Sequence, residues 1–208
     1  MKTAPPKMTV TIAVVTVVSF VLLNVIGKLE PAAAVGGFIP ARLSGMQVIG
    51  ALPVWLTPLS ATLLHAGAIH IGFNLMMLFY CGREDEVALG PAGIVVLYVV
   101  GAYAAAAAQF AVGPHSVVPM VGASGAISAL VGAYAMLYGQ RRPSKYSPEV
   151  ARWLHIAWLA TAWIVVQLLL GLVSRSQGMA IAAAAHIGGF LAGLVLARPM
   201  LLWRYRKA

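Results

Sequence analysis

The sequence predicts an all-α polytopic membrane protein with six transmembrane helices. Of its 208 residues, 61% are hydrophobic and only 9% are charged, and the mean hydropathy is +0.90. Soluble domains carry about a quarter charged residues, so a water-soluble globular protein is excluded. The apolar residues also form runs of roughly 15 to 25 residues between short charged or Gly/Pro-bearing segments, which is typical of polytopic helical membrane proteins.

The first apolar segment, residues 8–26, contains 19 residues without a charge. As a helix it is about 28 Å long, close to the hydrocarbon thickness of a bilayer. A signal peptide is the alternative, since Lys2 and Lys7 precede the segment and the alanines of residues 32–34 resemble a cleavage site. The length of the run and the five spans that follow favour a transmembrane helix. We expect those spans at residues 59–81, 94–112, 124–138, 153–173 and 179–203, in one membrane domain covering residues 1–208.

The distribution of Lys and Arg predicts the orientation of the chain. With the N-terminus inside, eleven basic residues face the cytoplasm and three face outward, as the positive-inside rule requires. The inner group comprises Lys2, Lys7, Arg83, Arg141, Arg142, Lys145, Arg152, Arg198, Arg204, Arg206 and Lys207, and the outer group Lys28, Arg42 and Arg175. Both termini are then cytoplasmic. The outer segment of residues 27–58 is too apolar for a solvated linker and is expected to lie in the membrane interface.

The net charge of +9 is explained by this anchoring and does not indicate a nucleic-acid partner. The single cysteine, Cys81, excludes an internal disulfide. All five carboxylates fall in loops or at span ends, which disfavours a proton- or cation-coupled carrier. Polar residues inside spans are few, and such residues are candidates for function. They are His65, His70 and Asn74 in the second span, Ser124 in the fourth, His155 and Gln167 in the fifth, and His186 in the sixth.

The fourth span is short. Its 15 residues make a helix of about 22 Å against a core of about 30 Å, so Ser124 is expected about 8 Å below the outer surface. The Gly- and Pro-bearing residues 113–119 before it cannot all be helical, and irregular backbone at that depth requires a protein-lined or wet cavity. Ser124 at the floor of a pocket open to the outside has free N–H groups and the positive end of the helix dipole beside it, which are features that stabilise an oxyanion. The alternative is that Ser124 only caps the helix.

A nucleophilic serine needs a base, and histidine is the neutral-pH base present at membrane depth. The sixth span carries a stripe of small residues beside His186, and the fourth span carries one as well, so that the two backbones can approach closely. The stripes are Gly189 and Gly193, and Gly125, Ala129 and Ala133. This approach would bring His186 to Ser124 as a Ser-His dyad without a buried carboxylate. The alternative is that His186 is a packing or hydrogen-bonding residue.

Two further side chains point to the same pocket. His70 and Asn74 are four residues apart, hence on one helix face, and could both donate hydrogen bonds there. His65 is five residues from His70, about 140° around a helix, so the two are not an i, i+4 metal pair. A metal site of His65, His70 and His186 is a disfavoured alternative. We assign no role to His155 or His115.

Four short motifs, in this order and on these spans, resemble those of the rhomboid intramembrane serine proteases. They are His70 to Asn74 (His-x-x-x-Asn), the acidic turn Gly82 to Glu86, the Gly-Ala-Ser-Gly of Gly122 to Gly125, and Ala-His-Ile-Gly-Gly from Ala185 to Gly189. The similarity covers residues 38–201. The resemblance implies a rhomboid-like bundle and structural roles for Gly122, Gly125, Gly189 and Gly193.

The resemblance also implies an activity, namely hydrolysis of a peptide bond in or beside the transmembrane helix of a membrane protein substrate. Ser124 would be the nucleophile and His186 the general base. His70, Asn74 and the Ser124 backbone N–H would bind the oxyanion, and His65 would stabilise the outer loop. No cofactor or metal is implied.

The chain departs from the family pattern at two places. A Trp-Arg pair often precedes the second span, where this chain has Leu56 and Thr57, and an aromatic residue that often stacks on the catalytic histidine is replaced by Ser128. An active bacterial-type protease in the inner membrane, with its site opening outward, is the leading hypothesis. The alternatives are a catalytically silent rhomboid-fold protein that binds transmembrane helices, and a small-solute or metal carrier. The sequence predicts no oligomeric state.

Overall fold

The computed structural model describes residues 6–138, 146–175 and 183–206, and every regular element in these ranges is a helix. This confirms the all-α class. The long helices are α1 (Lys7–Val25), α4 (Ala68–Met77), α5 (Arg83–Val112), α6 (Ser124–Leu137), α7 (Pro148–Arg175) and α8 (Ala183–Arg204), with a π-helical turn, η4 (Leu78–Gly82), joining α4 to α5. Shorter helices between α1 and α4 are α2 (Leu29–Gly36), η1 (Pro40–Arg42), η2 (Val54–Leu56), α3 (Thr57–Ser60) and η3 (Ala61–Leu63).

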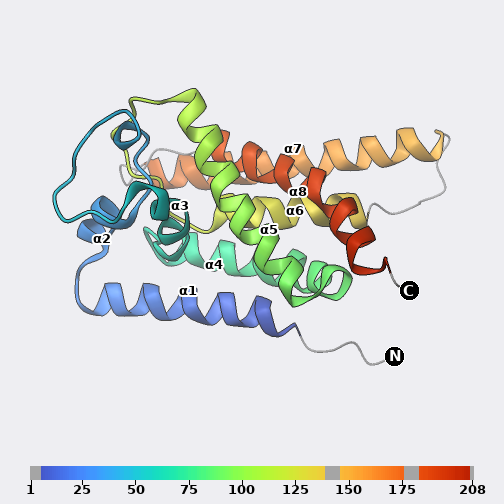
Figure 1. Ribbon diagram of the computed structural model, residues 1–208, viewed down its shortest axis with the longest axis horizontal. Helices are drawn as coiled ribbons and strands as arrows, with labels where there is room; N and C mark the ends of the chain where they lie inside the picture. Colours follow the sequence, from blue (N-terminus) through green and yellow to red (C-terminus); the bar gives the residue numbers. More distant parts are fainter. Residues whose placement is uncertain (1–5, 139–145, 176–182, 207–208) are drawn as a thin grey trace.

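Among the described residues, four helical stretches are long and apolar enough to cross a membrane: Lys7–Val25, Ala68–Val112, Pro148–Val166 and Ala183–Arg204. The second has 45 residues, about 68 Å of straight helix, which exceeds one crossing. The chain turns back within it, so α4 and α5 run in different directions (Figure 1). Gly90, with φ of 79°, breaks the helical backbone just before Pro91. The predicted start of the last span at residue 179, and the predicted inner charges Arg141, Arg142 and Lys145, lie outside the described residues.

The second predicted span begins later than the sequence suggested. Residues 59–67 are not part of its helix, because the chain forms the short turns α3 and η3 and an extended break before α4 begins at Ala68. Gly67, which precedes α4, has an extended backbone (φ 176°, ψ 170°), and glycine is a poor helix former. The apolar pattern cannot distinguish such turns from a continuous helix. His65 therefore lies off the helix, and the 140° separation from His70 argued above is wrong.

The acidic turn after the second span is the first turn of α5, which begins eleven residues before the predicted third span. Asp85 and Glu86 are buried there. The Glu86 carboxylate accepts hydrogen bonds from the backbone N–H groups of Met8 and Thr9, at 2.9 and 2.8 Å, and from the Thr9 hydroxyl at 2.6 Å. A carboxylate at a helix start accepts hydrogen bonds from the free N–H groups there and interacts favourably with the positive end of the helix dipole. Glu86 thus joins α1 to α5 and has a structural task.

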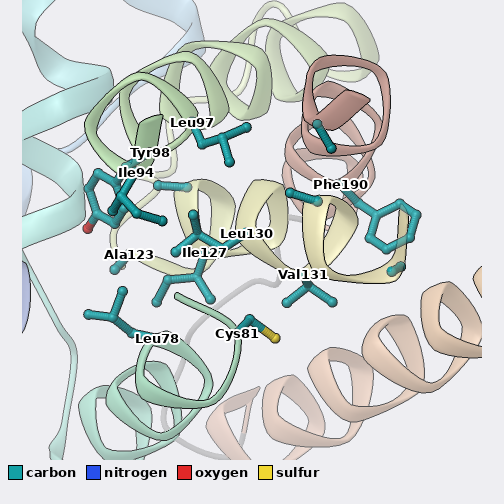
Figure 2. Close-up of a cluster of buried hydrophobic side chains, with 14 of the residues drawn as sticks. Leu78, Cys81, Ile94, Leu97, Tyr98, Ala123, Ile127, Leu130, Val131 and Phe190 are labelled. Carbon is teal, nitrogen blue, oxygen red and sulfur yellow. The ribbon is translucent and has the colours of Figure 1, made fainter. Parts of the chain in front are cut away.

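Helix α6 is the centre of the bundle, since residues 124–133 are all buried. Its Ile127 and Leu130 contact the apolar core together with Leu78 from η4 and Ile94 and Leu97 from α5 (Figure 2). Each of these five side chains is at most 1% exposed. A helix of 14 residues is about 21 Å long, against about 28 Å for the 19 residues of α1. Apart from α4, α6 is the shortest of the long helices, and it is the one most enclosed by protein.

Helices α6 and α8 pack with their backbones in near contact. A Cβ atom at Gly189 would overlap the carbonyl oxygen of Gly125, and one at Gly193 would overlap that of Ala129. On another side of α6, a Cβ at Gly125 would lie 2.6 Å from the Ala105 Cβ on α5. Small residues permit such close helix approach. The two stripes found in the sequence therefore face each other.

The segment between α1 and α4 covers one end of the bundle, while α1 begins and α8 ends at the other (Figure 1). Phe38 and Met120 exchange backbone hydrogen bonds of 3.0 and 2.8 Å, and the Ala41 N–H donates to the Ser116 carbonyl at 3.0 Å. These bonds tie the long segment to the chain that leads into α6. The Gly122 N–H also donates to Ala61 at 2.9 Å. Backbone hydrogen bonds from the segment between α1 and α4 thus hold the residues that lead into α6.

The contact between α6 and α8 gives a stability prediction. Gly193→Ala is expected to lower the free energy of unfolding by about 1–3 kcal/mol, because the added methyl group overlaps the Ala129 carbonyl and overpacking costs this much. The control is Gly72→Ala on α4, where an added Cβ meets nothing within 4 Å and alanine favours helix. Thermal unfolding in one detergent measures both. Equal melting temperatures for the two variants would show that the helices are not in such close contact.

Candidate active site

Ser124 is the first residue of α6, and its Oγ lies 2.8 Å from Nε2 of His186 on α8. The two residues are 62 positions apart in the chain and are only 7% and 6% exposed. The residue at the cap position is Ala123, and no side chain caps the helix. The alternative that Ser124 only caps α6 is therefore wrong, and His186 hydrogen-bonds with Ser124 in addition to packing between helices.

The local geometry of Ser124 follows from the turn before it. Gly122 has φ of +114°, a conformation that residues with a side chain rarely adopt. A Cβ atom at this position would lie 2.6 Å from Nε2 of His70 and 3.7 Å from Nδ2 of Asn74. Both side chains come from α4 and reach the turn two residues before Ser124. The structure thus brings His70 and Asn74 to the start of α6, as the sequence predicted.

His65 lies in this site as well, although it is not on a helix. Its Nε2 is 2.9 Å from Nδ2 of Asn74 and accepts a hydrogen bond from the Ala123 N–H at 3.4 Å, and its ring contacts that of His70 at 5.0 Å between centroids. Because the amide nitrogen and the backbone N–H are both donors, Nε2 of His65 is the unprotonated acceptor. His65 therefore contacts both the Asn74 amide and the residue before Ser124. The role in stabilising the outer loop that the resemblance implies stays a prediction.

One residue of the site was not found from the sequence. Trp163 of α7 is 4% exposed, and its Nε1 donates a hydrogen bond of 2.7 Å to the Ser128 Oγ. Its ring meets that of His186 edge to face, with 6.4 Å between centroids. A tryptophan inside an apolar span needs a partner for its N–H, and this was the signal that could have drawn attention to Trp163.

Metal ligation has no support in the described ranges, which contain no group of three or more His, Cys, Asp or Glu placed to hold an ion. His155 is half-buried on α7, and His115 is exposed on the segment before α6. The Nδ1 atom of His186 has no hydrogen-bond partner among the described residues. The cluster is therefore a serine, an imidazole that can take its proton, and donors at a helix start. This set suits the chemistry of acyl transfer.

The family model for the rhomboid domain matches residues 53–203, nearly three quarters of the chain. The chain belongs to the rhomboid family. The matched range contains α3 to α8 almost entire, and with them every residue of the site described above. Helix α1, held by Glu86, precedes the matched range.

Several curated rhomboids are similar to this chain. A protein named rhomboid protease GlpG from Pectobacterium atrosepticum is 31% identical over 193 residues, which is 91% of this chain and 61% of the relative. Proteins of the same name from Serratia proteamaculans and Yersinia enterocolitica are 33% identical over 140 residues and 28% identical over 192 residues, covering 66% and 91% of this chain and 45% and 61% of the relatives. This rhomboid thus spans about half to three fifths of the length of these relatives.

Proposed function

We propose that this rhomboid is an intramembrane serine endopeptidase that hydrolyses a peptide bond in or beside the transmembrane helix of a membrane protein substrate. The observation that carries the proposal is the 2.8 Å contact between Ser124 Oγ and His186 Nε2. A serine becomes nucleophilic when a base within hydrogen-bond reach takes its proton. The relatives named rhomboid protease support the same activity.

In the proposed mechanism, Nε2 of His186 accepts the Ser124 proton as Oγ attacks the scissile carbonyl carbon. The carbonyl oxygen becomes an oxyanion, which the side chains of His70 and Asn74 and the Ser124 N–H stabilise. His186 then gives the proton to the leaving amine, and the C–N bond breaks to leave an acyl-enzyme. A water molecule, deprotonated by His186, hydrolyses the ester and restores Ser124. The mechanism uses no metal or cofactor.

We further propose that the bundle crosses the membrane six times, through α1, the α4–η4 stretch, α5, α6, α7 and α8. The break at Gly90 and the reversal of direction between α4 and α5 support two crossings within residues 68–112. The short α6, anchored at its inner end, would then begin below the outer surface. The charge distribution supports cytoplasmic termini, a site that opens outward, and an inner-membrane location.

Ser124→Ala is expected to abolish cleavage of single-span reporter proteins that the wild-type protein cuts, while insertion and folding are retained. The change removes one hydroxyl that caps no helix, so its structural effect is small. A fluorophosphonate probe is expected to label the wild type at Ser124 and to label His186→Ala poorly, because the serine is inert without its base. Gel analysis of reporter fragments and peptide mass spectrometry measure the two results.

The matched control is Ser44→Ala, which changes an exposed serine of the outer segment and is expected to cleave as the wild type does. Activity of a few per cent or more in pure Ser124→Ala protein would refute Ser124 as the nucleophile. Binding of single-span helices without any cleavage by the wild type would instead support the catalytically silent alternative.

The oxyanion role gives a kinetic prediction for His70→Ala and Asn74→Ala. Each is expected to lower kcat more than it raises KM, because the donated hydrogen bond strengthens in the transition state. Loss of one such donor costs on the order of 100-fold to 1000-fold in serine hydrolases. The melting temperature is measured on the same preparations. A lower melting temperature with unchanged kcat per labelled molecule would mean that these residues only tie α4 to its neighbours.

A further inference from the structure

Helix α7 presents one of its tryptophans to the site and leaves the others at the surface. Trp163 is 4% exposed, whereas Trp153 and Trp158 on the same helix are 53% and 66% exposed. Because protein interiors are close-packed, the groups around a buried indole lie in direct contact with it. Trp163 is therefore part of the wall around the dyad.

A hydrogen-bond relay connects this indole to the nucleophile's own backbone. The Trp163 Nε1–H donates to Ser128 Oγ at 2.7 Å, and the Ser128 hydroxyl donates to the Ser124 carbonyl oxygen at 2.7 Å. Ser128 is fully buried, so losing either bond would leave a buried polar group unsatisfied. The relay fixes the position of the indole relative to the first turn of α6.

The imidazole of His186 has little else to hold it. Its Nε2 contacts Ser124, and its Nδ1 finds no partner among the described residues. In serine hydrolases with a triad, a carboxylate on Nδ1 orients the ring. Among the described residues, the aromatic ring that lies against the imidazole of His186 is that of Trp163, edge to face with an angle of 70° between the two planes. Edge-to-face aromatic pairs prefer defined geometries.

We propose that Trp163 is a positioning residue for His186, held by Ser128, so that α7 sets the orientation of the base toward Ser124. This rests on the proposed function of the dyad. Trp163 takes no part in bond making. It keeps the imidazole ring at the tilt that points Nε2 toward Ser124 Oγ. Trp163 on α7 contacts the ring, and Ser128 on α6 holds Trp163 in place through its hydrogen bond.

The experiment measures fluorophosphonate labelling of Ser124 in the purified full chain, as a maximal rate kinact and an affinity KI, with the melting temperature of each variant. Trp163→Leu is expected to lower kinact on the order of 10- to 100-fold, the cost of misplacing a catalytic group, with KI within about twofold. Trp163→Phe, which keeps a ring but no N–H, is expected to lose less. The matched control, Trp158→Leu on the exposed side of α7, is expected to keep the wild-type kinact.

Ser128→Ala completes a double-mutant cycle. If Ser128 acts through Trp163, the double variant is expected to label no more slowly than Trp163→Leu alone. Trp163→Leu with wild-type kinact, or losses that multiply in the double variant, would overturn the proposal. If Trp163→Leu does not fold, Ser128→Ala decides: a lower kinact at unchanged melting temperature supports positioning, and an unchanged kinact overturns it.

The proposed function and this inference fail in different ways. If the wild-type protein is not labelled at Ser124, the dyad itself is refuted. If the wild type is labelled and Trp163→Leu labels equally fast, only the positioning role is refuted.

Discussion

The site depends on one constraint, the near contact of the α6 and α8 backbones. Gly189 and Gly193 lie against the carbonyls of Gly125 and Ala129, where no side chain fits. This spacing brings residues 62 positions apart in the chain within one hydrogen bond, Ser124 Oγ to His186 Nε2. In a membrane the hydrophobic effect contributes little to the association of helices, and the close packing of small residues stabilises it instead. The stripe that holds the bundle together is therefore also the one that aligns Ser124 with His186, the proposed dyad.

The rest of the site is arranged around the first turn of α6. The absence of a side chain at Gly122 leaves room for His70, and His65 contacts both the Asn74 amide and the N–H before Ser124. The segment between α1 and α4 forms backbone hydrogen bonds with the residues leading into this turn. Groups from α4, α7, α8 and the break before α4 thus converge on one helix start, whose free N–H groups suit a developing negative charge.

The sequence was sufficient for features that depend on spacing along one helix. Ser124 at the start of a short apolar helix, His186 beside its glycines, and the shared face of His70 and Asn74 are such features. It was insufficient where the outcome depends on contacts between elements. The place of His65 depends on its contact with the residue before α6, and the apolar pattern hides both this contact and the extended break at Gly67. Trp163 was missed because α7 carries three tryptophans, and the sequence does not show which of their N–H groups finds a buried partner.

The central claim is that the contact between α6 and α8 makes Ser124 a nucleophile with oxyanion donors beside it. A crystal structure of the protein after reaction with a fluorophosphonate tests this most directly. We predict a covalent bond from phosphorus to Ser124 Oγ, with the phosphonyl oxygen at about 2.7–3.1 Å from donors of His70, Asn74 or the Ser124 N–H. An unmodified Ser124, or a phosphonyl oxygen that points away from all three donors, would contradict the account.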